Sequence, residues 1–186
     1  FANPDVKTII SQDVSLFSGT LRSNLDPFNE HTDHECWDVL ERCHLTTILQ
    51  GSLSRTQESS EITLDMPISQ TGSLSAGERQ LVAMARAILR RSNVVILDEA
   101  TSQIDSDLDD QIQRTIREEF AGAIVITIAH RLKTVLDYDR IMVLDSGEIA
   151  EFDAPNVLLR KPGSSFRDMC RASTDRRVYQ AASEAH

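Results

Sequence analysis

Long apolar runs and clusters of positive charge are both missing from this 186-residue sequence. No apolar stretch approaches the roughly 18 to 20 residues that a membrane-spanning helix needs. The 19 Lys and Arg residues form no dense run and are outnumbered by 29 Asp and Glu, which leaves a formal net charge of −10. This balance argues against general binding of nucleic acid or of anionic membranes. Any phosphate site would have to be built locally.

Cysteine and aromatic residues are also few. Aromatic side chains make up 5% of the sequence, whereas the apolar share of 40% is that of an ordinary globular domain. The three cysteines, Cys36, Cys43 and Cys170, have no framework spacing, and no secretory-leader pattern is present. We therefore expect a reducing compartment and no disulfide scaffold. Histidines lie near Cys36 and Cys43, but the spacing matches no common zinc site, so both cysteines are predicted to be structural.

The phosphate-binding loop G-x-x-x-x-G-K-[ST] is missing as well, because none of the seven glycines is followed by lysine. The sequence opens on Phe1 rather than methionine, and "KTIIS" has the pattern of a strand almost at once. We expect from this that the chain is a piece of a longer polypeptide. Its 186 residues are nonetheless enough for one domain with a real core.

Predicted strands alternate with predicted helices along the sequence. Continuous apolar runs predict buried strands at 7–11, 93–97 and 123–129. A turn at Ser146-Gly147 predicts a hairpin of two strands at 140–152. Helical periodicity predicts helices at 32–45, from Ser75 to about residue 91, at 106–120 and at 132–137. Residues 13–30 have turn signals and are predicted to form a loop. The alternation indicates an α/β fold with an open parallel sheet.

Polar residues follow three of the predicted strands: Gln12, the adjacent pair Asp98 and Glu99, and His130. Because ligands of open parallel sheets bind beyond the carboxyl ends of the strands, we expect these residues to line one edge. Asp98 suits Mg²⁺, which takes one or two protein carboxylates. Glu99 could orient or deprotonate an attacking water, with His130 supporting transition-state charge and Gln12 touching metal or water. The structural alternative is that these residues only open turns or cap strands.

Two predicted helices begin with the spacing of a capping box: Thr32 with Glu35, and Ser75 with Glu78. In "LSAGE" this box alone explains why a helix starts. The same residues also suit an anion, because a helix N-terminus with a serine hydroxyl and a glycine, Gly77, permits close backbone approach. The sequence leaves both interpretations open.

Four segments, in this order, resemble the motifs of one family: "QDVSLFSGTLRSNL", "LSAGERQ", "VVILDEATSQID" and "IAHR". They are similar to the Q-loop, the signature motif, the Walker B motif with its D-loop, and the H-loop of the ATP-binding domain of ABC transporters. The segments "ECWDVLERCHL", "LDMPISQTGS" and "RIMVLDSGEIAEFDAPNVLL" look most like the second such domain of the C subfamily, the multidrug-resistance-associated type. The resemblance runs to about Ala172.

This resemblance implies a P-loop NTPase core of the ABC ATPase type, with a parallel sheet and an inserted α-helical subdomain, lacking the N-terminal strands and the P-loop. The partial ATP-binding domain would span residues 1–172, with the helical subdomain at about 18–91 and a tail at 173–186. ATP and Mg²⁺ are the implied cofactors. The implied partners are a second ABC ATP-binding domain in a head-to-tail dimer and the transmembrane domains of the same transporter, with no nucleic acid. The chain would then work at the cytoplasmic face of a membrane, as part of an integral membrane transporter.

The resemblance also assigns roles at the predicted sheet edge. Gln12 would lie near Mg²⁺ and the attacking water. Asp98 would be the Walker B aspartate, and Glu99 would be the general base. His130 would be the switch histidine of the H-loop.

A second group of residues would face the ATP of the partner domain. Ser75, Ala76 and Gly77 would contact its γ-phosphate, and Asp105 of the D-loop would reach across the interface. Glu78, in the same signature motif, stands where glutamine is commonest in the family. Likewise "SQID" replaces the usual S-A-L-D.

The largest departure from the family is the missing opening of the domain, with its adenine-stacking aromatic, its P-loop and its lysine. We therefore expect that the chain alone does not hold ATP in its own half-site, and that its sheet exposes apolar edges and faces. Two alternatives stay open. One is a non-transport ABC-type ATPase, and the other is a truncated module that supplies Ser75 and Gly77 to a partner's ATP without hydrolysing its own.

Overall fold

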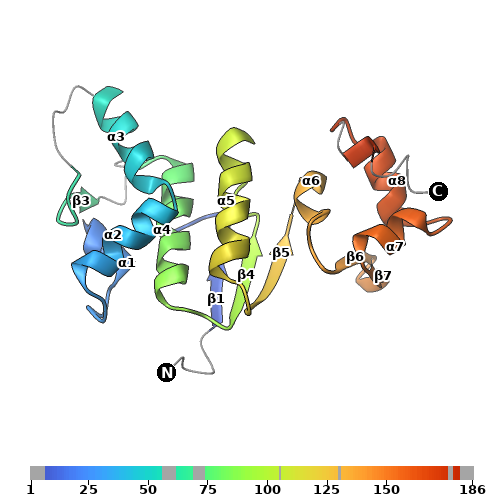
Figure 1. Ribbon diagram of the computed structural model, residues 1–186, viewed down its shortest axis with the longest axis horizontal. Helices are drawn as coiled ribbons and strands as arrows, with labels where there is room; N and C mark the ends of the chain where they lie inside the picture. Colours follow the sequence, from blue (N-terminus) through green and yellow to red (C-terminus); the bar gives the residue numbers. More distant parts are fainter. Residues whose placement is uncertain are drawn as a thin grey trace. The chain divides into compact units, whose positions relative to one another are not determined.

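The computed structural model describes residues 7–55, 62–68, 74–104, 106–129, 131–175 and 178–180. The chain divides into two compact units, Phe1–Ile128 and Ala129–His186. Each unit is described by itself below, with the elements labelled as in Figure 1. The predicted limits of a helical subdomain at 18–91 and of a tail from residue 173 stay predictions.

The first unit contains a three-stranded parallel sheet (Figure 1). Its strands, in spatial order, are β1 (Lys7–Ile10), β4 (Val94–Asp98) and β5 (Ile124–Ile128). Each strand corresponds to one of the apolar runs in the sequence, so the predicted parallel α/β sheet is confirmed. Because all three strands run the same way, the residues that follow β1 and β4 emerge at one edge.

Two 14-residue helices, α4 (Ala76–Leu89) and α5 (Ser106–Glu119), share a core with one face of this sheet. Leu81 of α4 and Ile112 of α5 are buried in the same cluster as Val95 and Leu97 of β4. The predicted helices from Ser75 and at 106–120 are therefore confirmed. Burial of these aliphatic side chains, each contributing about 1.5–3 kcal/mol, fixes the helices against the sheet.

The segment between β1 and α4 contains short elements, and here one prediction was wrong. The elements are β2 (Gly19–Thr20), α1 (Leu21–Leu25), α2 (Asp33–Arg42), α3 (Leu45–Arg55) and β3 (Pro67–Ile68). Residues 13–30 were predicted to form a loop, but they include β2 and α1. Thr20 caps α1 by accepting a hydrogen bond from the Ser23 amide at 3.1 Å. A helix of five residues is too short to show a periodic apolar pattern, so α1 could not be recognised from periodicity.

Helix α2 begins as predicted. The Thr32 hydroxyl accepts a hydrogen bond from the Glu35 amide at 3.3 Å, and the Glu35 carboxylate accepts one from the Thr32 amide at 2.8 Å. Cys36 and Cys43 are fully buried, and burial raises the pKa of the Cys43 thiol to about 12. A buried thiol of this kind is a poor nucleophile and metal ligand, which supports the structural role predicted for both cysteines.

The other face of the sheet is apolar and largely open. Four of its isoleucines are at least half exposed: Ile9 67%, Ile124 63%, Ile126 50% and Ile128 54%. Directly paired residues of neighbouring strands point to the same face of a sheet. Ile9 pairs with Ile96, Ile96 pairs with Ile126, and Asp98 pairs with Ile128. The Asp98 side chain therefore points to the exposed apolar face, and not toward α4 and α5.

The second unit is built on an antiparallel hairpin. Its elements are α6 (Leu132–Val135), β6 (Ile141–Asp145), β7 (Glu148–Asp153), α7 (Pro155–Arg160) and α8 (Ser165–Ala172). Ser146 and Gly147 join the strands with φ values of 50° and 85°. Two successive positive φ angles are those of a type I′ turn, so the predicted hairpin turn is confirmed.

A buried glutamate connects this hairpin to the helices that follow it. The Glu151 carboxylate accepts hydrogen bonds from the Ser164 hydroxyl at 3.0 Å and from the Phe166 amide at 3.1 Å. Lys161 lies 3.5 Å away. Burial alone would raise the pKa of Glu151, but these hydrogen bonds and the lysine charge outweigh it and lower the pKa. The ionised carboxylate therefore holds the start of α8 on β7.

Replacing Glu151 by Ala should loosen α8. Hydrogen bonds to charged groups contribute about 1.5–3 kcal/mol each, so the loss of both should lower the free energy of opening for amide exchange in α8 by at least about 3 kcal/mol. Because the folded pKa lies below the ordinary value of 4.5, this stabilisation is present above pH 4.5 and is lost as the pH falls through the folded pKa. Glu148→Ala, at an exposed position of the same strand, is the matched control. Equal exchange in both variants would contradict the role of Glu151.

Candidate functional site

The candidate site lies where β1 and β4 end. Asp98 is the last residue of β4, and Glu99 follows it with a positive φ of 49°. The Glu99 amide donates a hydrogen bond to the backbone oxygen of Ile128, at 3.0 Å, which fixes it to the end of β5. The acidic pair is thus held by the sheet, and Asp98 points to the open face. A single half-buried carboxylate at a strand end is compatible with Mg²⁺, which keeps several of its waters.

Gln12 and Glu99 are brought together through their backbones. Gln80, on α4, donates from its side-chain nitrogen to the carbonyl oxygen of Gln12 at 3.3 Å and to that of Glu99 at 3.4 Å. The predicted meeting of these two chain segments at one edge is therefore observed. The chemical roles of Gln12, Asp98 and Glu99 stay predictions.

Gln80 is the residue of this region that sequence reasoning missed. It is 1% exposed. The signal in the sequence was a polar residue at helical spacing from two apolar residues, Met84 and Ala87. A polar side chain at a buried helical position requires hydrogen-bond partners. The pattern predicts that partners exist but not which residues they are.

The signature segment begins α4 with the predicted capping box. The Ser75 hydroxyl accepts a hydrogen bond from the Glu78 amide at 3.2 Å, and the Glu78 carboxylate accepts one from the Ser75 amide at 2.6 Å. Ser75 is exposed, Ala76 and Gly77 are half-buried, and Glu78 is buried. The structural interpretation of "LSAGE" is confirmed, and the exposed serine leaves the anion-binding interpretation open.

Gly77 is crowded by the segment that follows Glu99. A Cβ atom added at Gly77 would lie 3.1 Å from the backbone oxygen of Gln103 and 3.7 Å from the Ile104 side chain. The sequence predicted that this glycine permits the approach of an anion. The structure adds a second reason for a glycine, which is close contact with the chain's own backbone.

Replacing Gly77 by Ala should stabilise the chain less than the same change at Gly51. Gly to Ala in a helix gains about 0.5–1 kcal/mol. Gly51, in α3, has nothing within 4 Å of an added Cβ, so it should show the whole gain. At Gly77 the methyl group meets the Gln103 carbonyl, and the gain should be cancelled or reversed. Urea unfolding followed by the fluorescence of Trp37, the single tryptophan, measures both variants, and equal gains would contradict the crowding.

Two of the predicted site residues, Asp105 and His130, lie outside the described residues. Within the described ranges, no group of three or more His, Cys, Asp and Glu side chains is arranged to hold a metal. A Mg²⁺ site with one protein carboxylate would not form such a group.

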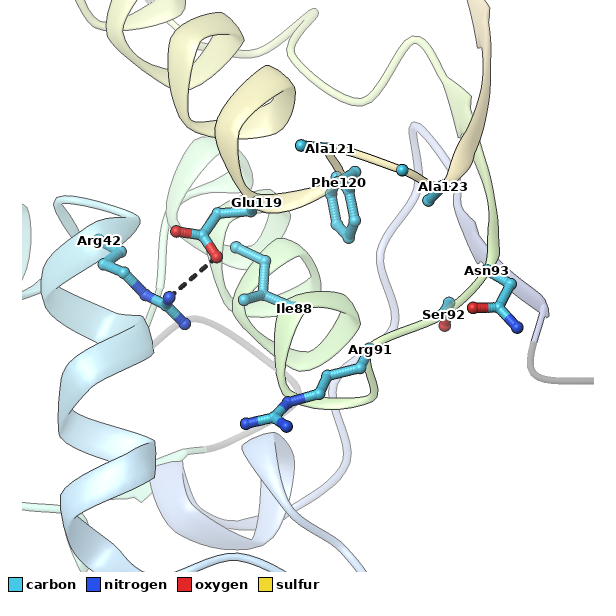
Figure 2. Close-up of a pocket in the computed structure, with 10 residues that line it drawn as sticks. Arg42, Ile88, Arg91, Ser92, Asn93, Glu119, Phe120, Ala121 and Ala123 are labelled. Atoms are coloured by element: carbon cyan, nitrogen blue, oxygen red, sulfur yellow. Dashed lines mark ion pairs between the residues drawn. The ribbon is translucent and has the colours of Figure 1, made fainter. Parts of the chain in front are cut away.

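A pocket of about 350 Å³ lies at the other end of the sheet (Figure 2). It is lined by residues before β4 and β5 and by the last turns of α4 and α5, together with Arg42 of α2. Figure 2 shows Arg42 reaching toward Glu119, with which it forms an ion pair at 2.9 Å. Thr115 also donates a hydrogen bond to the Arg42 carbonyl at 3.2 Å. The ion pair and this hydrogen bond connect α2 to α5. None of the predicted site residues lines the pocket.

Comparison with known proteins identifies the class. The model of the ABC transporter family matches residues 5–102. The chain is 48% identical over 163 residues to ATP-binding cassette sub-family C member 4 of Homo sapiens, covering 87% of this chain and 12% of that protein. It is 47% identical over 175 residues to the oligomycin resistance ATP-dependent permease YOR1 of Saccharomyces cerevisiae, covering 89% of this chain and 12% of that protein. The chain belongs to the ABC transporter family.

The relatives bear out the resemblance to the C subfamily. The multidrug resistance protein mrp-7 of Caenorhabditis elegans is 50% identical over 166 residues, which cover 87% of this chain and 10% of that protein. The chain thus spans about a tenth of the length of the curated relatives that it matches. No helix in the described part of the chain is long and apolar enough to cross a membrane.

Proposed function

We propose that this chain supplies the metal and water side of an ATP site in an ABC exporter, and that hydrolysis there is coupled to transmembrane transport. The observation that carries the proposal is the convergence of Gln12 and Glu99 at one edge of a parallel sheet, with Asp98 beside them. Family membership gives this edge its chemistry, because ABC ATPases bind ATP.

In this proposal each residue at the edge has one task. Asp98 would bind Mg²⁺ with a carboxylate oxygen, and the Mg²⁺ neutralises charge on the phosphates of ATP. Glu99 would accept a proton from the water whose oxygen attacks the γ-phosphorus, as the bond to the leaving ADP oxygen breaks. Gln12 would orient this water, and His130 would donate a hydrogen bond to the transferred phosphoryl group.

The signature segment would serve a second ATP, held by a partner domain in a head-to-tail dimer. Ser75, Ala76 and Gly77 begin α4, and an exposed helix N-terminus offers backbone N–H groups to a phosphate. The Glu78 carboxylate accepts a hydrogen bond from the Ser75 amide in the helix cap, so Glu78 would lie next to this phosphate contact. Asp105 would reach across the interface between the two domains.

The side of the site that grips the phosphates would come from outside these 186 residues. Asp98 points to the open apolar face of the sheet, so a segment that covers this face would also cover the metal. We propose that this segment carries the G-x-x-x-x-G-K-[ST] loop.

Calorimetry of the 186-residue chain tests this division. No ATP binding at micromolar strength is expected, because the chain offers no phosphate-binding loop and no lysine after a glycine. The full-length protein should bind MgATP in the same experiment. Tight binding by the short chain would contradict the division of the site.

The exporter role is tested with the full-length protein in lipid vesicles. The protein should release phosphate from MgATP, and this release should stop when Mg²⁺ is chelated. The protein should move a substrate across the membrane only when ATP is present. Relatives named for oligomycin resistance and multidrug resistance suggest drug-like substrates as the first to try. Hydrolysis without any transport would favour a non-transport ABC-type ATPase.

The absence of a lysine after any glycine, and so of a G-x-x-x-x-G-K-[ST] loop in this sequence, supports a second candidate function. If no phosphate-binding loop completes the site, the chain would act as a module that offers Ser75 and Gly77 to a partner's ATP. In that case a mixture with an intact partner domain would hydrolyse ATP only at the partner's site, and substitution of Glu99 would leave the rate unchanged.

A further inference from the structure

Gln80 joins three elements at the candidate site. Its side-chain nitrogen has two hydrogens, and it faces two carbonyl oxygens, those of Gln12 and Glu99. The opposite orientation of the amide would place its oxygen against both carbonyls, so the donor role is fixed by the surroundings. A side chain of α4 thus holds the residues that follow β1 and β4.

Glu99 needs this support because its backbone is strained. Its φ of 49° lies in the left-handed region, which is unfavourable for a residue other than glycine. The Glu99 amide is held by the Ile128 carbonyl at 3.0 Å, and the Glu99 carbonyl is held by Gln80 at 3.4 Å. Both ends of the strained residue are therefore fixed, one by the sheet and one by α4. Strain that is maintained by surrounding contacts is typical of functional positions.

Gln80 also links the candidate site to the signature segment, because Gln80 and this segment both lie on α4. Ser75 caps the helix that carries Gln80, and Gly77 on the same helix leaves room for the Gln103 carbonyl, which would lie 3.1 Å from an added Cβ. The two hydrogen-bond distances of 3.3 and 3.4 Å are slightly longer than the usual N–H···O range of about 2.7–3.2 Å. A small movement of α4 along its axis would therefore shorten or break them.

We propose that Gln80 is a positioning residue for hydrolysis, which holds the general base Glu99 and the water-orienting Gln12 in register with the signature helix. The proposal rests on the proposed function of this edge. When α4 is seated, Gln80 fixes the Glu99 peptide and the carboxylate is aimed at the water. When α4 shifts, the Glu99 peptide is released and the base loses its orientation. Because Gln80 is buried, it would act through the two carbonyls to which it donates, and not by touching ATP or the water.

The test uses phosphate release by the full-length protein in lipid vesicles over a range of MgATP concentrations. Gln80→Met has nearly the same size and lacks the donors. Because misplacement of a catalytic group by about 1 Å costs up to a hundredfold, kcat should fall roughly ten- to hundredfold. KM for ATP should not change, because Gln80 is buried and its side chain meets backbone carbonyls of its own chain. Gln111→Met, at an exposed position of α5, makes the same chemical change and should leave kcat and KM as they are.

A second variant separates positioning from simple support of the fold. Gln80→Glu keeps the shape, but its ionised carboxylate would repel both carbonyls. Burial raises the pKa of such a group, and the protonated form can donate an O–H to one carbonyl. The activity of Gln80→Glu relative to the original protein at the same pH should therefore rise as the pH is lowered from 8 to 6, whereas that of Gln80→Met should stay low.

The outcomes distinguish this inference from the function on which it rests. If the protein hydrolyses ATP and Glu99→Gln stops it, the proposed function stands. An unchanged kcat in Gln80→Met would then overturn the positioning role. The positioning role would also be overturned if kcat in Gln80→Met falls only in proportion to the protein that no longer binds ATP, because that is a defect of folding. If the original protein does not hydrolyse ATP, the proposed function fails and the positioning role fails with it.

Discussion

Replacing Glu99 by Gln in the full-length protein is expected to reduce ATP turnover by a factor of about 100 to 10,000. The amide has the size of the carboxylate but cannot accept the proton of the attacking water. Binding of MgATP should persist, because Asp98 and the signature segment are unchanged. Phosphate release measures the turnover, and a labelled nucleotide measures binding under the same conditions.

The control for this experiment is Glu118→Gln. Glu118 is an exposed glutamate on α5, so the same loss of charge occurs away from the sheet edge and should not affect turnover. Equal rates for Glu99→Gln and the unmodified protein would show that Glu99 is not the base of a working site. That result would favour the non-hydrolysing module. Accumulation of an ATP-bound dimer in Glu99→Gln would instead support the head-to-tail arrangement.

The parts of the fold that could be predicted are those whose signals are local. The strands β4 and β5 are continuous apolar runs, and such runs fit a sheet interior. The starts of α2 and α4 are set by capping boxes at Thr32 and Ser75, whose partners are three residues away. Neither signal depends on distant parts of the chain, so both could be identified from the sequence.

The parts that could not be predicted depend on distant residues or on very short elements. The strands β2 and β3 are two residues each, and their pairing is set by the surrounding tertiary structure. Gln80 is separated by 68 residues from Gln12 and by 19 from Glu99 in the sequence. Its helical spacing from the apolar Met84 and Ala87 was visible, but the partners that justify its burial appear only when the sheet and α4 are assembled.

The edge of the sheet was predicted by a topological rule. Strand polarity alone brings the residues after β1 and β4 together, because parallel strands end on the same side. The rule placed Gln12 near Glu99, and the structure confirms that proximity through Gln80. The rule did not indicate to which face of the sheet the Asp98 side chain would point. That face follows from the pairing of Asp98 with Ile128, and it is the exposed one.

Replacing Ser75 by Asp should separate the helix cap that Ser75 forms from the γ-phosphate contact that we propose for it. Asp is as good a helix cap as Ser, so the free energy of unfolding of the 186-residue chain should hardly change. In the full-length protein, however, the new carboxylate would stand where a γ-phosphate is expected. Two unit charges about 4 Å apart repel by about 4 kcal/mol at an effective dielectric constant near 20, so turnover should fall at least about a hundredfold.

Ser75→Ala gives the opposite pattern and completes the comparison. The loss of the hydroxyl removes the cap of α4, which accepts from the Glu78 amide, and should cost about 1 kcal/mol of stability. The backbone N–H groups of the first turn remain, so turnover should fall less than in Ser75→Asp. Stability should thus rank Ser and Asp above Ala, whereas turnover should rank Ser above Ala and Ala above Asp. If Asp equals Ser in both measurements, Ser75 only caps the helix, and no phosphate approaches it during hydrolysis.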